Sequence, residues 1–382
     1  MPSTLPLLSA TFGELPAATL GYLLLYLATL VIHVVFMGYV LAGSAYLAGV
    51  VTLRRDHTPD PFEPLLREWL PFMLSLAITA GVAPLLFIQI LYRPQFYTAN
   101  LLLFHRWMAV VPVLIVAFYL LYLLKVRWGA SRSPLVSPAI GLVAAGCFVF
   151  IAWSWTENHL LSLADQQVWS DQYVSRSWVY RSSQVLPRLG IWFFGTFPIL
   201  AVWLGWQAWW QMPAGGTDPL AEDHRSAELA ARRGAVIGLA GLALALICAV
   251  LYAIMLPAEH RAALSPAPLL IAWGIAAVGL IVAAVLFVRQ WRIGRLGLLP
   301  LMLQSLALIG AIAGVAWLRE ALRLHVVDVA ALADTHAAAA DVGGRWVFAA
   351  FLVINAVLIG WCVRAVLPQT AVGRSDRSGD AV

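Results

Sequence analysis

The sequence predicts an all-α fold, a polytopic membrane helical bundle of about nine transmembrane helices. Of the 382 residues, 62% are hydrophobic and only 11% are charged, and the mean hydropathy is +0.84. A soluble domain would carry roughly a quarter of charged residues. The apolar stretches are long enough to cross a hydrocarbon core of ~30 Å, which takes ~20 helical residues. Their apolar residues run continuously instead of alternating, which favours helices over a membrane barrel.

Nine apolar stretches are the expected spans, and the positions of the basic residues give their orientation. Fifteen of the twenty-four Lys and Arg residues fall in loops or tails on one side if the N-terminus lies outside. Because cytoplasmic loops carry an excess of Lys and Arg, we expect the N-terminus outside and the C-terminus inside. The expected spans are 17–53, 68–92, 98–126, 135–156, 184–210, 231–256, 267–290, 296–318 and 344–367.

The composition divides the chain into two halves. Residues 1–211 form a five-helix N-terminal half rich in aromatic residues, and residues 231–370 form a four-helix C-terminal half rich in Ala, Gly and Leu. Residues 212–230 are expected to be a cytoplasmic linker, because Pro, Gly and Thr crowd its start. Residues 371–382 are expected to be a disordered tail. The polar segment that begins at Asp165 is expected to form a short interfacial helix.

His33 is the most unusual residue of the first span. It lies in a segment, 17–53, that contains no Asp, Glu, Lys or Arg. An ionisable ring in hydrocarbon is costly and needs a reason. A neutral imidazole can ligate a metal, which in a membrane is often haem iron. The alternative is that the ring bonds a backbone carbonyl or a polar neighbour.

His105 is predicted to lie at the same depth as His33, toward the outer face. Arg54 follows His33 by 21 residues and Lys125 follows His105 by 20; at 1.5 Å per residue both rings lie ~30 Å from the inner edge. The two rings could ligate one haem, or His105 could be an interface residue. Arg106 could pair with haem propionates or snorkel to the surface. Trp107 could stack on a porphyrin or belong to the interfacial aromatic belt.

A group of charged residues is expected to gather at the outer ends of three spans. Such a group could be an outer docking surface, a propionate cradle or a set of loop salt bridges. Its members are Glu157, Arg188, Arg319, Glu320 and Arg323.

Several types of functional site are excluded because their sequence motifs are absent. No P-loop, dinucleotide fingerprint, nucleophile elbow or zinc spacing occurs. The cysteines, Cys147, Cys248 and Cys362, form no Cys-x-x-Cys-His pattern, so covalent haem c is not expected on this chain. A transporter would show broken helices around a polar midplane cavity, and no span is clearly broken in that way.

Three motifs of this sequence resemble those of subunit I of the cytochrome bd oxidase family. The resemblance rests on a single His in the first span (Ile32-His33-Val34), on Arg106-Trp107-Met108-Ala109, and on the Glu320-x-x-Arg323 motif. In that family the first-helix His ligates a high-spin haem, so the resemblance implies haem b bound through His33. The family's Glu before Met-Ala is replaced here by His105.

The departures from the family pattern bear on function. The positions of the two low-spin haem ligands fall near Gly190 and Ala235, and that of a further haem-binding Glu falls near Ala313. The long outer quinol loop is missing. We therefore expect a divergent member that is not a classical quinol oxidase. It would be an inner-membrane redox subunit that transfers electrons with other respiratory subunits, including a c-type cytochrome on the outer face. The alternative is a non-catalytic scaffold that has lost its cofactors.

Overall fold

The computed structural model describes residues 15–53, 60–128, 135–211, 222–267, 269–344, 346–358 and 361. These residues form helices and no strand, as the sequence predicts. Eight helices are long and apolar enough to cross a membrane, and a bent pair, Ala333–Asp341 with Trp346–Leu358, would make nine. The prediction of an all-α polytopic bundle is therefore confirmed.

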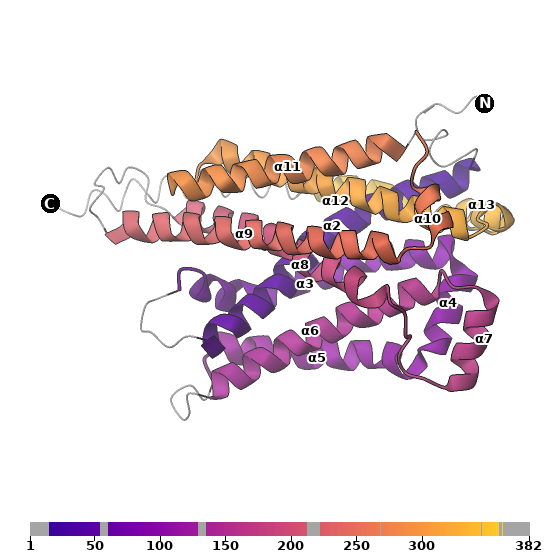
Figure 1. The fold of residues 1–382 in the computed structure, drawn as a ribbon, viewed down its shortest axis with the longest axis horizontal. Helices are drawn as coiled ribbons and strands as arrows, with labels where there is room; N and C mark the ends of the chain where they lie inside the picture. Colours follow the sequence, from indigo (N-terminus) through magenta and orange to yellow (C-terminus); the bar gives the residue numbers. More distant parts are fainter. Residues whose placement is uncertain are drawn as a thin grey trace.

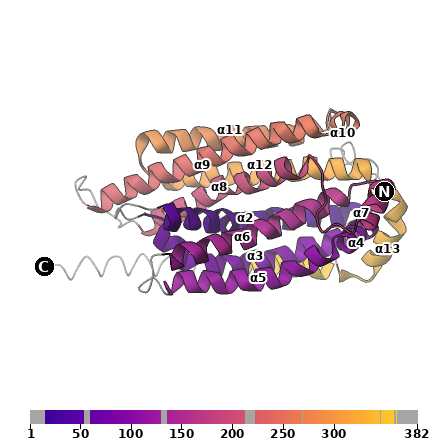
Figure 2. The same cartoon turned by 60° about the horizontal axis from the view of Figure 1, so that its bottom comes forward.

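The long helices run side by side along the length of the molecule, and the short ones gather at one end (Figures 1 and 2). The long helices are α2 (Ala17–Leu53), α3 (Glu63–Leu91), α5 (Phe104–Lys125), α6 (Val136–Leu161), α8 (Val185–Gln211), α9 (Glu222–Met255), α11 (Leu269–Ile293) and α12 (Leu298–Val326). The short helices are α4 (Arg93–Leu102), α7 (Gln166–Ser175), α10 (Ala258–Ala263), the 3-10 turn η1 (Ala330–Leu332) and α13 (Ala333–Asp341).

The helix boundaries differ from the prediction in two places. The expected span 98–126 is interrupted at Leu103, where α4 ends and α5 begins. The predicted linker is helical from Glu222 onward, because α9 extends beyond its apolar part as a polar helix. There Glu228 and Arg232, four residues apart, form an ion pair at 2.8 Å. The predicted tail and the end of the ninth span lie outside the described residues. The predicted interfacial helix is α7, which Asp165 caps by accepting a hydrogen bond from the Val168 amide at 2.9 Å.

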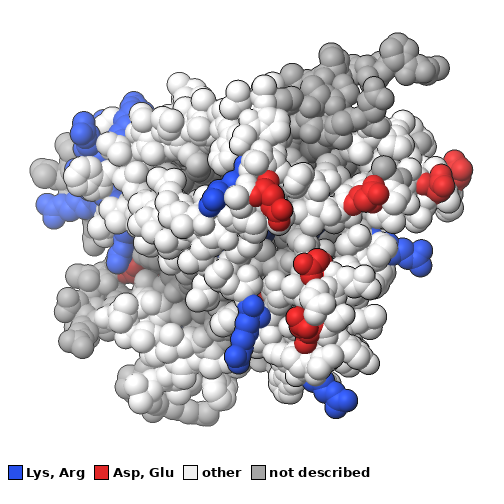
Figure 3. Space-filling view, turned by 45° about the vertical axis from the view of Figure 1, so that its right-hand side comes forward, with Lys and Arg blue, Asp and Glu red and all other residues white. Residues whose placement is uncertain are grey.

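The two ends of the bundle differ in charge. The end where α5, α8 and α11 finish is called here the Lys125 end; it carries basic residues such as Arg232, Arg289 and Arg292. The opposite end, where α6 finishes, is called the His159 end. In Figure 3 several Lys and Arg lie along the left edge, and most of the acidic side chains lie on the other half together with further Lys and Arg. Uncharged residues cover most of the rest of this face. This pattern is typical of a protein whose middle faces lipid.

Small residues let α11 and α12 approach closely. A Cβ atom added at Gly314 of α12 would lie 2.7 Å from the carbonyl oxygen of Ala272 in α11. A Cβ atom added at Gly279 of α11 would overlap the carbonyl oxygen of Ala307 in α12. Such contacts between backbones are a main source of helix association in lipid, where no hydrophobic force drives helices together.

Candidate functional site

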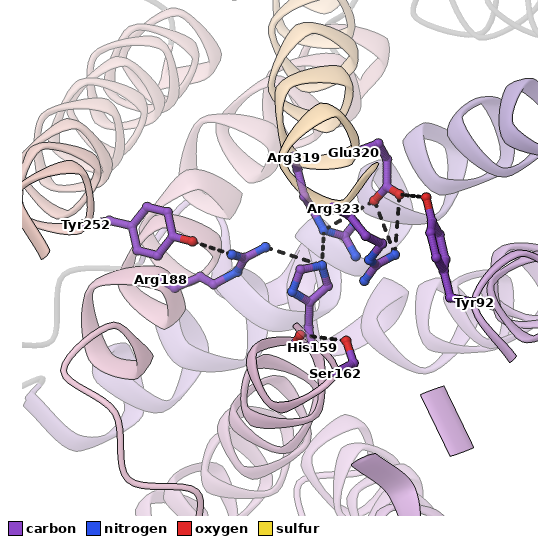
Figure 4. A network of polar contacts seen from close by, with 8 residues as sticks. All are labelled: Tyr92, His159, Ser162, Arg188, Tyr252, Arg319, Glu320 and Arg323. Carbon is purple, nitrogen blue, oxygen red and sulfur yellow. Dashed lines mark hydrogen bonds and ion pairs between the residues drawn. The ribbon is translucent and has the colours of Figure 1, made fainter. Parts of the chain in front are cut away.

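A buried polar cluster occupies the His159 end of the bundle. It joins the last turn of α6, the start of α8, the last turn of α9, the last turns of α12 and the junction of α3 with α4 (Figure 4). We call it the His159 cluster; its members are Tyr92, His159, Arg188, Tyr252, Arg319, Glu320 and Arg323. Charged side chains at such depth are costly unless they are paired, so each partner matters.

His159 is the centre of the cluster. Its Nε2 atom accepts a hydrogen bond from Arg319 Nε at 3.0 Å and lies 3.5 Å from Arg188 Nη2. A guanidinium group has donors and no acceptor, so Nε2 must be the unprotonated nitrogen of a neutral ring. The proton is then on Nδ1, which is buried and has no hydrogen-bond partner in the described part of the chain. The cluster therefore contains a buried donor that is not satisfied.

Glu320 supplies the only carboxylate among the cluster's members. It is fully buried; each of its oxygens lies 3.4 Å from Arg323 Nη1, and Oε1 lies 3.8 Å from Arg319 Nε. The Tyr92 hydroxyl donates to Glu320 Oε2 at 2.9 Å, and its ring lies 4.5 Å below the Arg323 guanidinium. Burial, together with the Glu320 carboxylate, raises the pKa of the Tyr92 phenol well above its usual value. Tyr92 therefore stays protonated and remains a donor.

Arg188 has no carboxylate partner among the described residues. It is 6% exposed, it donates to the Tyr252 hydroxyl at 2.6 Å, and it lies 5.3 Å from the centre of that ring. Three guanidiniums and one carboxylate give the cluster a formal charge of three minus one, or +2. With the unpaired donor on His159, the arrangement has an excess of positive charge and of donors. Chemically, it suits an anionic group, most simply a carboxylate or phosphate.

Glu157 and Arg106 form a separate buried pair. Arg106 Nε lies 3.4 Å from Glu157 Oε2 and donates to Ser154 Oγ at 3.0 Å. The Trp153 indole donates to Glu157 Oε1 at 2.6 Å. Glu157 points away from His159 because residues two apart on a helix face in directions about 200° apart. Arg106 is buried, so it does not snorkel to the surface; its near partner is Glu157, which already neutralises it.

The predicted outer cluster is thus only partly brought together. Arg188, Arg319, Glu320 and Arg323 meet around His159, whereas Glu157 does not join them. These side chains are almost entirely buried, so they do not form an exposed surface. Glu320 does pair with Arg319 and Arg323, but inside the bundle and not in a loop. Neighbouring helices bury the ends that the sequence alone leaves open.

His33 is on α2, and its half-buried ring lies against α3. Its Nδ1 atom lies 3.0 Å from the carbonyl oxygen of Ala77, so Nδ1 carries the proton and donates. Gly81, one turn further along α3, leaves the room for the ring: a Cβ atom there would lie 2.9 Å from His33 Cε1. Nε2 is then the unprotonated nitrogen. A histidine that ligates a metal through Nε2 commonly has this bond on its other nitrogen.

The structure gives His105 and Trp107 different surroundings from those of His33. His105 is exposed, with its ring centre 5.6 Å from that of Trp178. Trp107 packs against Trp155 at 4.8 Å and Phe96 at 5.7 Å. No contact between the His33 and His105 rings occurs among the described residues. The described residues also hold no group of three or more His, Cys, Asp or Glu side chains suited to a metal ion.

Two residues of the site give no signal in the sequence. Tyr92 and Tyr252 look like ordinary membrane tyrosines. The packing of the α3–α4 junction against α12 brings Tyr92 to Arg323, and the packing of α9 against α8 brings Tyr252 to Arg188. His336, which lies outside the cluster, is fully buried; it lies 2.8 Å from Thr19 Oγ1 and 3.2 Å from the Leu91 carbonyl oxygen. These bonds hold α13 against the start of α2 and the end of α3.

Comparison with known proteins gives no match. No protein-family model matches the sequence. No curated protein and no solved structure matches it either.

Proposed function

We propose that this chain is an integral membrane redox subunit that binds a b-type haem and transfers electrons with partner redox subunits. The motifs that resemble cytochrome bd oxidase subunit I motivate the proposal. The observation that carries it is the hydrogen bond from His33 Nδ1 to the Ala77 carbonyl, which leaves Nε2 with a free lone pair in a helix that contains no Asp, Glu, Lys or Arg. When bound, the haem would supply a one-electron redox centre, and His33 would be its axial ligand.

The His159 cluster supports the same proposal from a second direction. Tyr26 forms a hydrogen bond to Arg323 and precedes His33 by seven residues on α2. Seven residues are two helical turns, so His33 lies ~10 Å further along nearly the same face of α2. The excess positive charge around Arg188 and Arg323 would accept the two propionate carboxylates of the haem. Their binding would also neutralise the formal charge of +2.

The surroundings of His105 and Arg106 alter the proposed ligand set. His105 is exposed and Arg106 is paired with Glu157, so neither fits a haem held by His33. We therefore propose His33 as the single histidine ligand of this chain. The Lys125 end would face the cytoplasm of an inner membrane, and the His159 end would face outward, where a c-type cytochrome could exchange electrons.

The second candidate is a membrane scaffold or anchor subunit that has lost its cofactors. One observation favours it: the Ala77 carbonyl alone satisfies His33 Nδ1, and Gly81 fits the ring closely, so the imidazole has a place in the fold without iron. The two candidates differ in whether the purified protein contains haem.

The test is a pyridine-haemochrome assay on the full chain, expressed with sufficient haem and purified in mild detergent. The proposal predicts b-type haem that is lost in His33→Ala. His105→Ala is the matched control, and because that ring is exposed its spectrum should stay unchanged. Purified, folded protein with no Soret absorbance would remove the haem proposal and leave the scaffold.

A further inference from the structure

A second site lies on the other half of the bundle, toward the Lys125 end. A cavity of about 680 Å³ opens between α8 and α12, with α2 and α3 at its edges. This volume is in the range of ligand pockets in proteins. Because α8 belongs to the N-terminal half of the chain and α12 to the C-terminal half, a molecule in the cavity contacts both halves. Its walls include Trp69, Trp203, Trp206, Gln207, Trp210 and Ser305.

The cavity extends over the depth of one lipid leaflet. Trp210 and Gln211 are the last two residues of α8 and line the mouth at the Lys125 end. Ile199 and Ile312, twelve and fourteen residues from the respective helix ends, line it ~20 Å deep. Half of a bilayer, headgroups included, is ~20–22 Å thick. A partner helix would cross the whole bilayer, so the depth of the cavity fits one lipid molecule and not a helix.

The walls of the cavity are apolar, and two of its indoles are held in place by neighbours. Trp206 Nε1 donates to Ser305 Oγ at 3.0 Å, and Trp203 Nε1 donates to the Val35 carbonyl at 3.3 Å. Because these N–H groups are bonded within the protein, the two rings offer carbon surface to a ligand. The residues that line the cavity include no Asp, Glu, Lys or Arg. Such a surface gains by contact with a chain of methylene groups.

Gln207 provides the polar group that can recognise a ligand. Its side-chain oxygen accepts a hydrogen bond from the Tyr39 hydroxyl at 3.1 Å, so the amide is oriented. Its NH₂ group has no partner among the described residues and can donate to a ligand. Gln207 is four residues from the end of α8, or ~6 Å from the mouth. At this depth, just inside the headgroup, a glycerophospholipid has its ester carbonyls, which accept hydrogen bonds.

A cation lies at the same end of the bundle as the mouth of the cavity, where a phosphate would be. Arg295 is exposed and lies in the turn between α11 and α12. The next residue, Leu296, reaches α8, because a Cβ atom added at Gly205 would lie 3.8 Å from Leu296 Cδ2. The turn therefore lies beside the α8 wall. Arginine suits phosphate, since its guanidinium can donate two parallel hydrogen bonds.

We propose that this cavity holds one glycerophospholipid from the leaflet at the Lys125 end, as a structural lipid that joins the two halves of the chain. One acyl chain lies along the indoles and reaches Ile199 and Ile312. An ester carbonyl accepts from the Gln207 amide, and the phosphate pairs with Arg295. The site is independent of His33 and of any haem.

The test uses the full chain, purified and washed in mild detergent. Native mass spectrometry should find one phospholipid retained per chain. Phosphatidylglycerol with a diazirine in one acyl chain is then titrated in, and the labelled peptides are mapped. We expect label on α8 and α12, displaced by excess unlabelled phosphatidylglycerol. Ile309→Trp should fill the cavity and reduce labelling at least tenfold. Gln207→Leu should reduce it about three- to tenfold, the effect of one neutral hydrogen bond. Arg295→Gln should reduce it about fivefold, the effect of one cation at a lipid surface.

Leu303→Trp is the matched control. Leu303 is on α12 like Ile309, it is equally exposed (42% against 43%), and it does not line the cavity. Labelling of this variant should equal that of the unchanged protein, and gel filtration should show that both Trp variants are folded. Equal labelling of Ile309→Trp and Leu303→Trp would overturn the proposal. So would label that unlabelled phosphatidylglycerol does not displace, or a retained molecule that contains no phosphate.

Discussion

Substitution of Glu320 by Gln tests the electrostatics of the His159 cluster most directly. The change keeps the shape of the side chain and removes its charge. Glu320 is fully buried and lies close to two guanidiniums and the Tyr92 hydroxyl. In the variant, Arg188, Arg319 and Arg323 would remain buried with a formal charge of +3 and no carboxylate among the cluster's members.

The expected loss follows from the cost of an unpaired buried charge. Removal of one partner of a buried pair costs about 3–5 kcal/mol, mostly because the remaining charge is left without compensation. We therefore expect Glu320→Gln to lower the free energy of unfolding by about 3–5 kcal/mol. The assay is equilibrium unfolding by SDS in mixed micelles, followed by circular dichroism.

Glu228→Gln is the control for the same chemical change on the surface. Glu228 pairs with Arg232 at 2.8 Å, but both side chains are about half exposed (52% and 45%). An exposed pair contributes about 0–1 kcal/mol because water and ions screen it. If Glu320→Gln costs no more than Glu228→Gln, the cluster is hydrated in the membrane-embedded protein, and the reasoning about its excess charge is wrong.

Three glycine substitutions test the packing contacts. Gly314→Ala should cost about 1–3 kcal/mol, because its Cβ atom would lie 2.7 Å from the Ala272 carbonyl oxygen and the two backbones must separate. Gly310→Ala on the same helix, whose nearest neighbour would be 3.9 Å away, should be neutral or stabilising in the same unfolding assay. Gly81→Ala should displace the His33 ring and break its bond to the α3 backbone. A change in the ¹⁵N shifts of His33 would report this, and unchanged shifts would contradict the described fit.

The helices were predictable from the sequence because each apolar run is longer than a membrane requires. The break at Leu103 was not, since no Pro or Gly occurs at that position. Pro94, the second residue of α4 and nine residues earlier, was the only local signal. The start of α9 was missed for a similar reason. A polar helix outside the membrane cannot be recognised from the hydropathy of its residues.

The contacts of the site residues could be predicted from the sequence only in part. Counting residues gave His33 and His105 the same height, but height does not fix the direction in which a side chain points around its helix. The structure places one ring against Ala77 and the other toward Trp178. The arginines of α8 and α12 were correctly expected at one end. Their convergence on His159 depends on helix crossings between residues far apart in the chain, which periodicity cannot give.

The close approach of α11 and α12 has a consequence for how the protein is made. Only four residues, 294–297, connect the two helices, and their backbones touch through glycine on both sides. Such a hairpin can assemble from its own contacts as soon as both segments have left the ribosome. A late-synthesised pair of this kind would dock onto an N-terminal half already resident in the bilayer, and the arginines at the end of α12 would be shielded only once that docking is complete.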